Sequence, residues 1–169
     1  MLAIKTTVYL FFLCVFGFVG LPLVLSWTHY SLSYNIGMFR WLGIIPMLFG
    51  FSFIVLFGYH LILFGKGTPA PYEYPKVLVT EGLYKIVRNP GYLGGLIVIS
   101  GESVVLQSLA LLAFALAMWL FVHSFVVFSE EPGLKKRFGV AYVEYCERVP
   151  RWFPRVNLKN RLNTDTFKL

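Results

Sequence analysis

The chain has 169 residues, of which 57% are apolar and 14% are charged, and its formal net charge is +7. A water-soluble domain carries about a quarter charged residues, so this composition excludes an ordinary soluble fold and indicates an integral membrane protein. The sequence contains no phosphate-loop or dinucleotide-binding glycine motif, and the spacing of its two cysteines, Cys14 and Cys146, predicts neither a disulfide framework nor a metal site.

The first two apolar runs are predicted to be transmembrane helices. Residues 8–27 form a run that is too long for the apolar core of a signal peptide and that no small-residue cleavage site follows, so we expect an uncleaved span. Residues 42–64 form a second run that is long enough to cross a bilayer. Small residues in this second run would let another helix approach it closely, namely Gly43, Gly50, Gly58 and Ser52.

The segment after the second span is predicted to contain a loop and two helix starts. Residues 66–75 carry three prolines, so they form either a linker or a shaped loop over a ligand. Thr80 is a candidate N-cap for a short helix. Asn89 and Pro90 predict the start of a third helix that runs to about Ser103, because Asn is favoured at the N-cap and Pro at the first helical position.

The third and fourth helices are predicted to form a hairpin in the membrane. The third helix would cover roughly 20 Å, which is less than the ~30 Å of a hydrocarbon core. Glu102 at its far end is expected to lie in an interfacial turn, and the alternative is a buried functional carboxylate. The fourth span, residues 107–128, brings the chain back, with His123 near its end. The segments 88–90 (Arg-Asn-Pro) and 130–132 (Glu-Glu-Pro) should therefore face each other at one membrane surface.

The distribution of basic residues predicts the orientation. With four spans, the termini and the middle loop share one side, which carries fourteen of the fifteen Lys and Arg residues and leaves only Arg40 on the other. The positive-inside rule predicts that this side, with both termini, is cytoplasmic. Topology and anionic lipid headgroups account for the positive net charge, so we expect the lipid bilayer and no nucleic acid as a partner.

Pro132 is predicted to begin an amphipathic helix that lies on the membrane surface. Its apolar positions recur at spacings of three or four and form one stripe: Leu134, Phe138, Tyr142, Tyr145 and Val149. The Trp and Arg side chains of residues 149–155 are expected to anchor at the headgroups, and residues 156–169 form a polar tail.

The two segments that meet at the surface suggest a ligand with both signs of charge. The start of a helix beside Arg88 suits a carboxylate or a phosphate. Glu130 and Glu131 suit a cation or ribose hydroxyls, or they merely complement the dipole of the helix that they begin. Tyr84 and Tyr92 offer aromatic faces to a sulfonium. S-adenosylmethionine satisfies all three features.

Three motifs in order support this ligand. They are G-L-Y-x-x-x-R-N-P-x-Y-L-G (residues 82–94), E-E-P-x-L-x-x-x-F-G-x-x-Y-x-x-Y (130–145) and R-V-P-R-W-F-P-R (148–155). The chain resembles the isoprenylcysteine carboxyl methyltransferase and phospholipid N-methyltransferase superfamily over residues 65–155. The resemblance implies an integral membrane methyltransferase that takes S-adenosylmethionine from the cytoplasm and a lipophilic acceptor from the bilayer.

The expected architecture is all-α. Residues 1–169 form a single membrane domain with four transmembrane helices, the last two a hairpin, and a cytoplasmic amphipathic C-terminal helix. Residues 1–64 hold the first two spans, residues 65–155 the methyltransferase-like core and residues 156–169 the tail.

The resemblance also implies the site residues by motif position. The cofactor contacts would be Val77, Leu78, Val79, Tyr84, Asn89, Pro90, Tyr92, Glu130 and, as the second member of the acidic pair, Glu131. The prenylcysteine enzymes have His at the position of Asn89 and a substrate-binding Arg at the position of Val126. His123, about one turn earlier, is the candidate for the role of that Arg. The candidate catalytic residues are thus His123, Glu130 and Arg88, and no metal is implied.

The expected reaction is direct in-line transfer of a methyl group to a membrane-resident or small hydrophobic acceptor, such as a prenylcysteine carboxylate, a lipid amine or a thiol. A carboxylate or thiolate needs no base, whereas an amine must lose a proton to His123 or a glutamate. One alternative is a membrane reductase, because NADPH-dependent sterol reductases look similar in the R-x-P-x-Y-L-G region. Another is a non-catalytic lipid-binding protein of the same fold.

Overall fold

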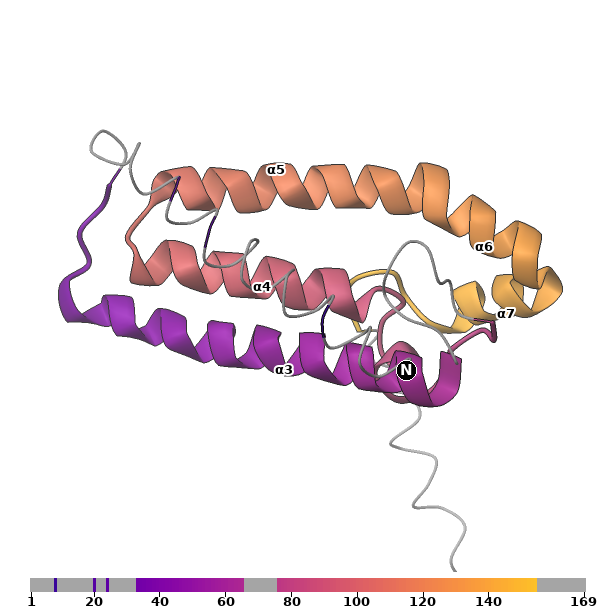
Figure 1. Ribbon diagram of the computed structural model, residues 1–169. Coiled ribbons are helices and arrows are strands. Elements are labelled where there is room, and N and C mark those ends of the chain that lie inside the picture. The colour runs from indigo at the N-terminus through magenta and orange to yellow at the C-terminus, as the bar shows by residue number, and fades with distance from the viewer. Residues whose placement is uncertain (1–7, 9–19, 21–23, 25–32, 66–75, 155–169) are drawn as a thin grey trace, which may run out of the picture.

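The computed structural model describes residues 33–65 and 76–154, together with Val8, Gly20 and Val24 (Figure 1). Apart from those three positions, the predicted first span, the loop 66–75 and the polar tail lie outside the described residues.

The described part of the chain is helical and contains no β-strand. In chain order it forms η3 (Gly37–Gly43), α3 (Ile44–His60), η4 (Leu61–Gly65), η5 (Gly82–Lys85), α4 (Pro90–Val105), α5 (Leu109–Phe125), η6 (Val126–Glu130), α6 (Glu131–Phe138) and α7 (Val140–Arg148). The all-α prediction is confirmed for this part.

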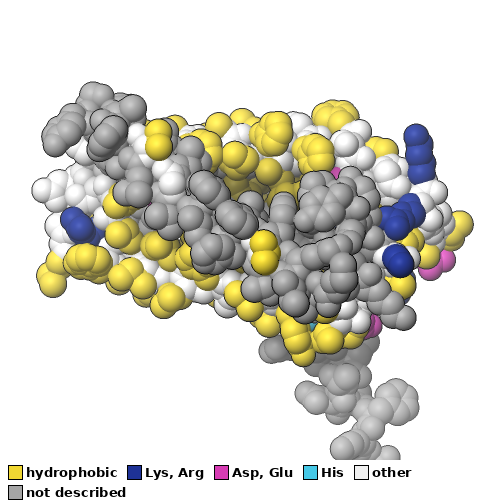
Figure 2. Space-filling view, in the orientation of Figure 1, with side chains coloured by type: hydrophobic (Ala, Val, Ile, Leu, Met, Phe, Trp, Pro, Cys, Tyr) yellow, Lys and Arg dark blue, Asp and Glu magenta, His cyan; other side chains and the backbone are white. Residues whose placement is uncertain are grey.

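Helix α4 lies between α3 and α5, and α6 and α7 sit at one end of this layer (Figure 1). Two stretches of the described residues are long and apolar enough to cross a membrane, 37–65 and 109–138, whereas α4 is shorter. Large apolar side chains are exposed along the layer, among them Leu48, Leu116 and Phe121. Figure 2 shows Lys and Arg side chains at the ends of the molecule and hydrophobic ones along its length. A lipid-facing surface explains this distribution.

Reciprocal glycine pairs set the contact between α3 and α4. A Cβ added to Gly50 would lie 2.6 Å from the carbonyl oxygen of Gly94, and one added to Gly43 would lie 2.6 Å from that of Gly101. The predicted close approach is confirmed for Gly43 and Gly50. It is wrong for Ser52, which is exposed and donates its hydroxyl to Phe49 O.

The chain before and within α4 differs from the prediction in two places. The short helix is a 3-10 turn with Glu81, and not Thr80, at its N-cap, because Gly82 has a φ of +61° and begins the turn. The prediction that Glu102 lies in a turn is also wrong. Helix α4 continues to Val105, so Glu102 remains in the helix and is 5% exposed.

The chain does not start a new helix at Pro132. Helix α5 continues through the π-helical turn η6 into α6, and Glu130 has helical angles of −72° and −51°. The π turn changes the hydrogen-bond register beside a proline that has no N–H to donate, so the helix passes on without ending. The predicted free helix N-terminus at Glu131 is therefore wrong.

The break occurs instead at Gly139, whose φ of +57° separates α6 from α7. The five predicted stripe residues still cluster, but across two helices. Tyr142, Tyr145 and Val149 are buried together, with Leu134, Phe138, Leu78 and Cys146 packed against them. The stripe thus packs within the protein, and the location of these helices on the membrane surface stays a prediction.

Candidate active site

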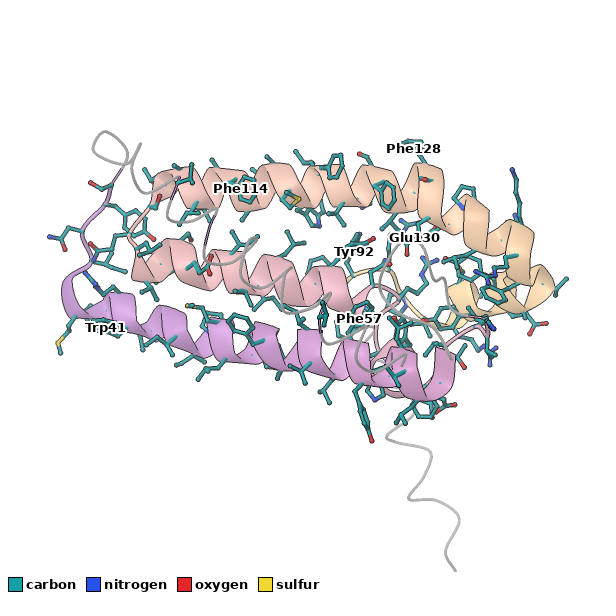
Figure 3. All side chains as sticks on the ribbon, viewed as in Figure 1. Trp41, Phe57, Tyr92, Phe114, Phe128 and Glu130 are labelled. Carbon is teal, nitrogen blue, oxygen red and sulfur yellow. The ribbon has the colours of Figure 1, made fainter. Side chains whose placement is uncertain are left out.

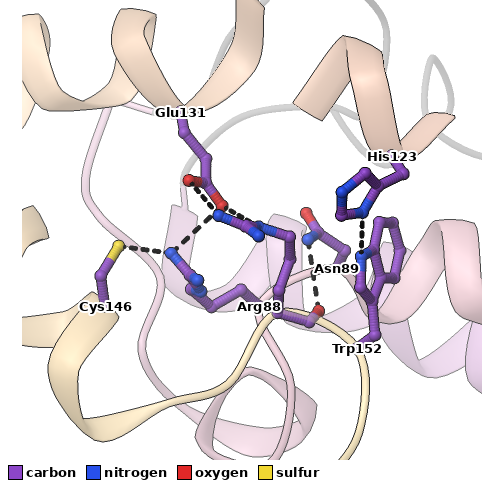
Figure 4. A network of polar contacts seen from close by, with 7 residues as sticks. Arg88, Asn89, His123, Glu131, Cys146 and Trp152 are labelled. Carbon is purple, nitrogen blue, oxygen red and sulfur yellow. Dashed lines mark hydrogen bonds and ion pairs between the residues drawn. The ribbon is translucent and has the colours of Figure 1, made fainter. Parts of the chain in front are cut away.

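Arg88, just before α4, lies next to Glu131, the first residue of α6, as the sequence predicts. Arg88 Nη1 lies 3.1 Å from Glu131 Oε1, and both side chains are largely buried (Figure 4). Arg88 also approaches Cys146 Sγ at 2.6 Å, and its backbone N–H donates to Pro150 O at 2.9 Å. The α4–α5 hairpin therefore brings a basic and an acidic residue into one ion pair.

Glu131 uses both carboxylate oxygens within the protein. Arg151 donates from Nε to Oε1 at 2.7 Å and from Nη2 to Oε2 at 2.9 Å, a forked arrangement that matches a carboxylate. The hydrogen bonds with Glu131 raise the pKa of Arg151 above its ordinary value. Because Arg88 contacts the same carboxylate, Glu131 links the segment before α4 to the segment after α7.

The chain after α7 forms a strap across the site, which we call the C-terminal strap (residues 149–153). Asn89 Nδ2 donates to Arg151 O at 3.3 Å, and Trp152 Nε1 donates to His123 Nδ1 at 3.0 Å. Trp152 is 6% exposed and packs with Val122 and Val126. The prediction that Trp152 anchors at the headgroups is wrong, because the strap turns inward and its indole finds a partner on α5.

Asn89 stands at the N-cap position of α4, and Pro90 follows in the first turn, as predicted. The Asn89 side chain makes no capping hydrogen bond, because its amide contacts the C-terminal strap instead. The Asn89 side chain therefore gives no acceptor to the N–H groups of the first turn of α4, although its backbone carbonyl accepts from Leu93 N at 3.1 Å.

Glu130 differs from its neighbour. A side-chain hydrogen bond joins it to Tyr92, and its Oε2 is buried without a hydrogen-bond partner among the described residues. In Figure 3, Glu130 and Tyr92 lie close to each other, and Phe57 lies on α3. A buried carboxylate oxygen without a partner is costly, so this atom marks a place for a donor or a cation.

Aromatic rings lie near the Glu130 carboxylate. The Tyr84 and Phe57 ring centroids are 6.3 Å apart, and Tyr145 donates its hydroxyl to Tyr84 O at 2.8 Å. Burial, with the nearby Tyr145 and Glu130, raises the pKa of Tyr84 above its ordinary value, so its ring remains a neutral phenol. Such faces attract a cation.

Three of the predicted cofactor contacts, residues 77–79 shortly before η5, differ in how far their side chains are exposed. Val79 is buried, Val77 is 47% exposed, and Leu78 packs against the Tyr142 cluster.

An apolar cavity of about 550 Å³ that is largely open to the outside lies between α4 and α5. Leu93, Leu96 and Ser100 line it from α4, Leu112 and Trp119 from α5, and Trp152 from the C-terminal strap. His123 adjoins it, because its ring is 5.6 Å from that of Trp119 and 6.2 Å from that of Trp152. This cavity is not predictable from the sequence, since apolar residues on two spans carry no signal that separates a cavity lining from a lipid-facing surface.

Comparison with known proteins identifies relatives of this part of the chain. The family model described as phospholipid methyltransferase matches residues 38–141. The Arabidopsis thaliana protein-S-isoprenylcysteine O-methyltransferase B is 46% identical over 81 residues, which cover 47% of this chain and 41% of that protein. The A form from the same plant is 40% identical over 87 residues, which cover 51% of this chain and 44% of that protein.

A solved structure shares the fold. The eukaryotic intramembrane Ras methyltransferase, isoprenylcysteine carboxyl methyltransferase, superimposes with a TM-score of 0.54 at 24% identity, and the match covers 72% of this chain and 44% of that one. The matched segments span less than half the length of these relatives.

Proposed function

This chain belongs to the phospholipid methyltransferase family, and on that premise we propose that it is an integral membrane methyltransferase that uses S-adenosylmethionine. Its acceptor is lipophilic or small and hydrophobic: a prenylcysteine carboxylate, a lipid amine or a thiol. The relatives named as isoprenylcysteine methyltransferases support the first of these.

The observation that carries the proposal is the buried Oε2 of Glu130. This carboxylate oxygen has no hydrogen-bond partner among the described residues, although Tyr92 makes a hydrogen bond with the same side chain. The amino group or the ribose hydroxyls of S-adenosylmethionine would supply the missing donor. The residues present therefore fit this cofactor.

The remaining contacts of the cofactor would come from residues near Glu130. Tyr84 and Tyr92 would face its cationic portion, with Phe57 behind Tyr84. The uncapped first turn of α4, at Asn89 and Pro90, suits a carboxylate. The residues before η5, Val77, Leu78 and Val79, would line the remaining apolar side.

Arg88 and Glu131 have a different part in this proposal. Their charges are paired with each other and with Arg151, so they hold the start of α4, which we call the α4 corner (residues 88–90), against α6. Arg88 would then act by fixing the position of Asn89 and Pro90, which follow it in the chain. Glu131 would fix the orientation of the helix that carries Glu130.

The chain contributes alignment and exclusion of water. S-adenosylmethionine, held by Glu130, Tyr84 and Tyr92, would supply an electrophilic methyl group on a sulfonium. The apolar cavity between α4 and α5 would hold the acceptor's hydrocarbon part. His123, which adjoins the cavity, would contact the polar end of the acceptor. Alignment of this kind contributes several kcal/mol, roughly 7–11 in well-oriented systems.

The proposal extends to topology. The chain crosses the membrane four times, and both termini and the site lie on the cytoplasmic side, since fourteen of fifteen basic residues fall there.

Calorimetry with detergent-solubilised protein tests the cofactor site. S-adenosylmethionine should bind the unmodified chain, and binding should weaken roughly ten- to a hundredfold in Glu130→Gln, because a charge-assisted hydrogen bond is lost. Asn89→Ala should weaken it through loss of the contact with the strap. Glu144→Gln is the matched control, since Glu144 is exposed and lies 4.0 Å from Arg148.

Equal affinity in the wild type and in the Glu130 and Asn89 variants would refute the site. NADPH, titrated into the same samples, should not displace S-adenosylmethionine; displacement would favour a reductase.

A further inference from the structure

The hydrogen bond between Trp152 and His123 fixes which imidazole nitrogen carries hydrogen. The indole nitrogen of Trp only donates, and Trp152 Nε1 lies 3.0 Å from His123 Nδ1. Nδ1 must therefore offer its lone pair, which requires a neutral ring with its hydrogen on Nε2. On the side away from Trp152, His123 thus presents a donor and not a lone pair (Figure 4).

The surroundings keep Trp152 in this position. Its indole is 6% exposed and packs against Val122 and Val126. The preceding residue of the C-terminal strap, Arg151, is held by Glu131 through two hydrogen bonds and by Asn89 through its carbonyl. The indole is therefore fixed by the same network that holds the α4 corner.

His123 lies beside the cavity that would hold the acceptor. The apolar cavity between α4 and α5 is lined by Trp119 and Trp152, the two rings that flank His123. The Ser100 hydroxyl, also in the lining, donates to Leu96 O at 2.8 Å. Ser100 and Trp152 thus use their donors within the protein, whereas the Nε2–H of His123 has no acceptor among the described residues.

We propose that Trp152 is a positioning residue that holds His123 as a hydrogen-bond donor to an anionic oxygen of the acceptor, and that His123 does not act as a base. This inference rests on the proposed function of the same site. A carboxylate suits it, because one oxygen accepts from Nε2–H while the other bonds to the methyl carbon. The C–S electron pair leaves with sulfur, and no proton has to be removed. A protonated amine has no lone pair, so it cannot accept a hydrogen bond from the Nε2–H of His123.

Nitrogen-15 NMR of histidine-labelled protein in detergent tests the tautomer without any turnover. We expect the Nε2–H form for His123 in the wild type and a mixture of both tautomers in Trp152→Phe, which keeps an aromatic ring but loses the N–H. Palmitate should shift the His123 Nε2 signal, and hexadecylamine should leave it unchanged. An Nδ1–H form in the wild type, or an equal response to both additives, overturns the inference.

Acceptor kinetics separate a donor from a base. Gln places an amide N–H near the position of Nε2 but cannot take a proton, whereas Leu provides neither function. His123→Gln should therefore retain most of the carboxylate methylation, while His123→Leu and Trp152→Phe raise the acceptor KM about five- to tenfold with kcat little changed. If His123→Gln is as impaired in kcat as His123→Leu, His123 acts as a base and the inference is wrong.

These results are distinguishable from failure of the proposed function. A chain that binds no S-adenosylmethionine contradicts the methyltransferase, while the tautomer and the palmitate response of His123 are measured without the cofactor. Conversely, methyl transfer with an Nδ1–H histidine leaves the methyltransferase intact and removes only the role of Trp152.

Discussion

Two adjacent glutamates have opposite environments in this site. Glu131 is held by Arg88 and by the fork of Arg151, so its charge is matched within the protein. Glu130, one residue earlier on the same helix, keeps a buried oxygen without a partner among the described residues. The helix separates the two side chains by about 100°, so one faces the arginines and the other faces Tyr92 and Tyr84. The first carboxylate thus stabilises the corner and the second is available to a ligand.

Breaking the Glu131 pair should destabilise the fold. Arg151→Ala leaves a largely buried carboxylate with one arginine in place of two, and we expect a loss of about 1–3 kcal/mol in the free energy of unfolding. Arg151→Lys should lose less, because Lys keeps the charge but not the forked geometry. Thermal unfolding in detergent measures both variants.

Arg148→Ala is the control for this change. Arg148 pairs with Glu144 at 4.0 Å, and both side chains are mostly exposed, so the effect should stay within about 0.5 kcal/mol. A loss in Arg151→Ala no larger than in Arg148→Ala would show that the forked pair does not hold the corner.

At the scale of elements, the contact of α3 with α4 decides where the site lies. The glycine pairs let the two backbones approach, and the end of α3 then brings Phe57 beside Tyr84. The continuous helix from α5 through η6 to α6 carries His123, Glu130 and Glu131 on one rod. The geometry of the site therefore depends on helix contacts that are several turns away from it.

A larger residue at the glycine contact should separate α3 from α4. Gly50→Val places side-chain atoms against the Gly94 carbonyl and should destabilise the protein by about 1–3 kcal/mol or more, with weaker cofactor binding. Ser52→Val changes an exposed position on the same helix and should have little effect. Thermal unfolding and calorimetry of both variants check this, and equal stability of the two would contradict the proposed contact.

At the scale of the whole molecule, the hairpin of α4 and α5 joins two short motifs, and the C-terminal strap closes over them. The sequence predicts the helices, the short α4 and the meeting of Arg88 with Glu131, because apolar length, Asn-Pro punctuation and hairpin geometry are local properties. It does not predict that helix α5 continues past Pro132, since Pro at a π turn and Pro at a helix start look alike in sequence.

The strap contacts are also beyond sequence reasoning. A Trp and an Arg after an amphipathic helix are typical of a headgroup anchor. Their true partners, His123 and Glu131, lie 29 and 20 residues away along the chain. Only the folded arrangement pairs them. The same holds for the unpaired oxygen of Glu130, because the motif position implies a role for Glu130 but two adjacent glutamates do not show which one the arginines hold.

Transfer of label from methyl-labelled S-adenosylmethionine tests the central claim most directly. The purified chain is incubated with the labelled cofactor and an extract of its native membranes, and the label is then measured in the molecules that partition into organic solvent. We predict that label enters this fraction with the wild type and with the Glu144→Gln control, and that Glu130→Gln reduces it at least tenfold. Absence of label with the wild type, or undiminished label with Glu130→Gln, would contradict the account.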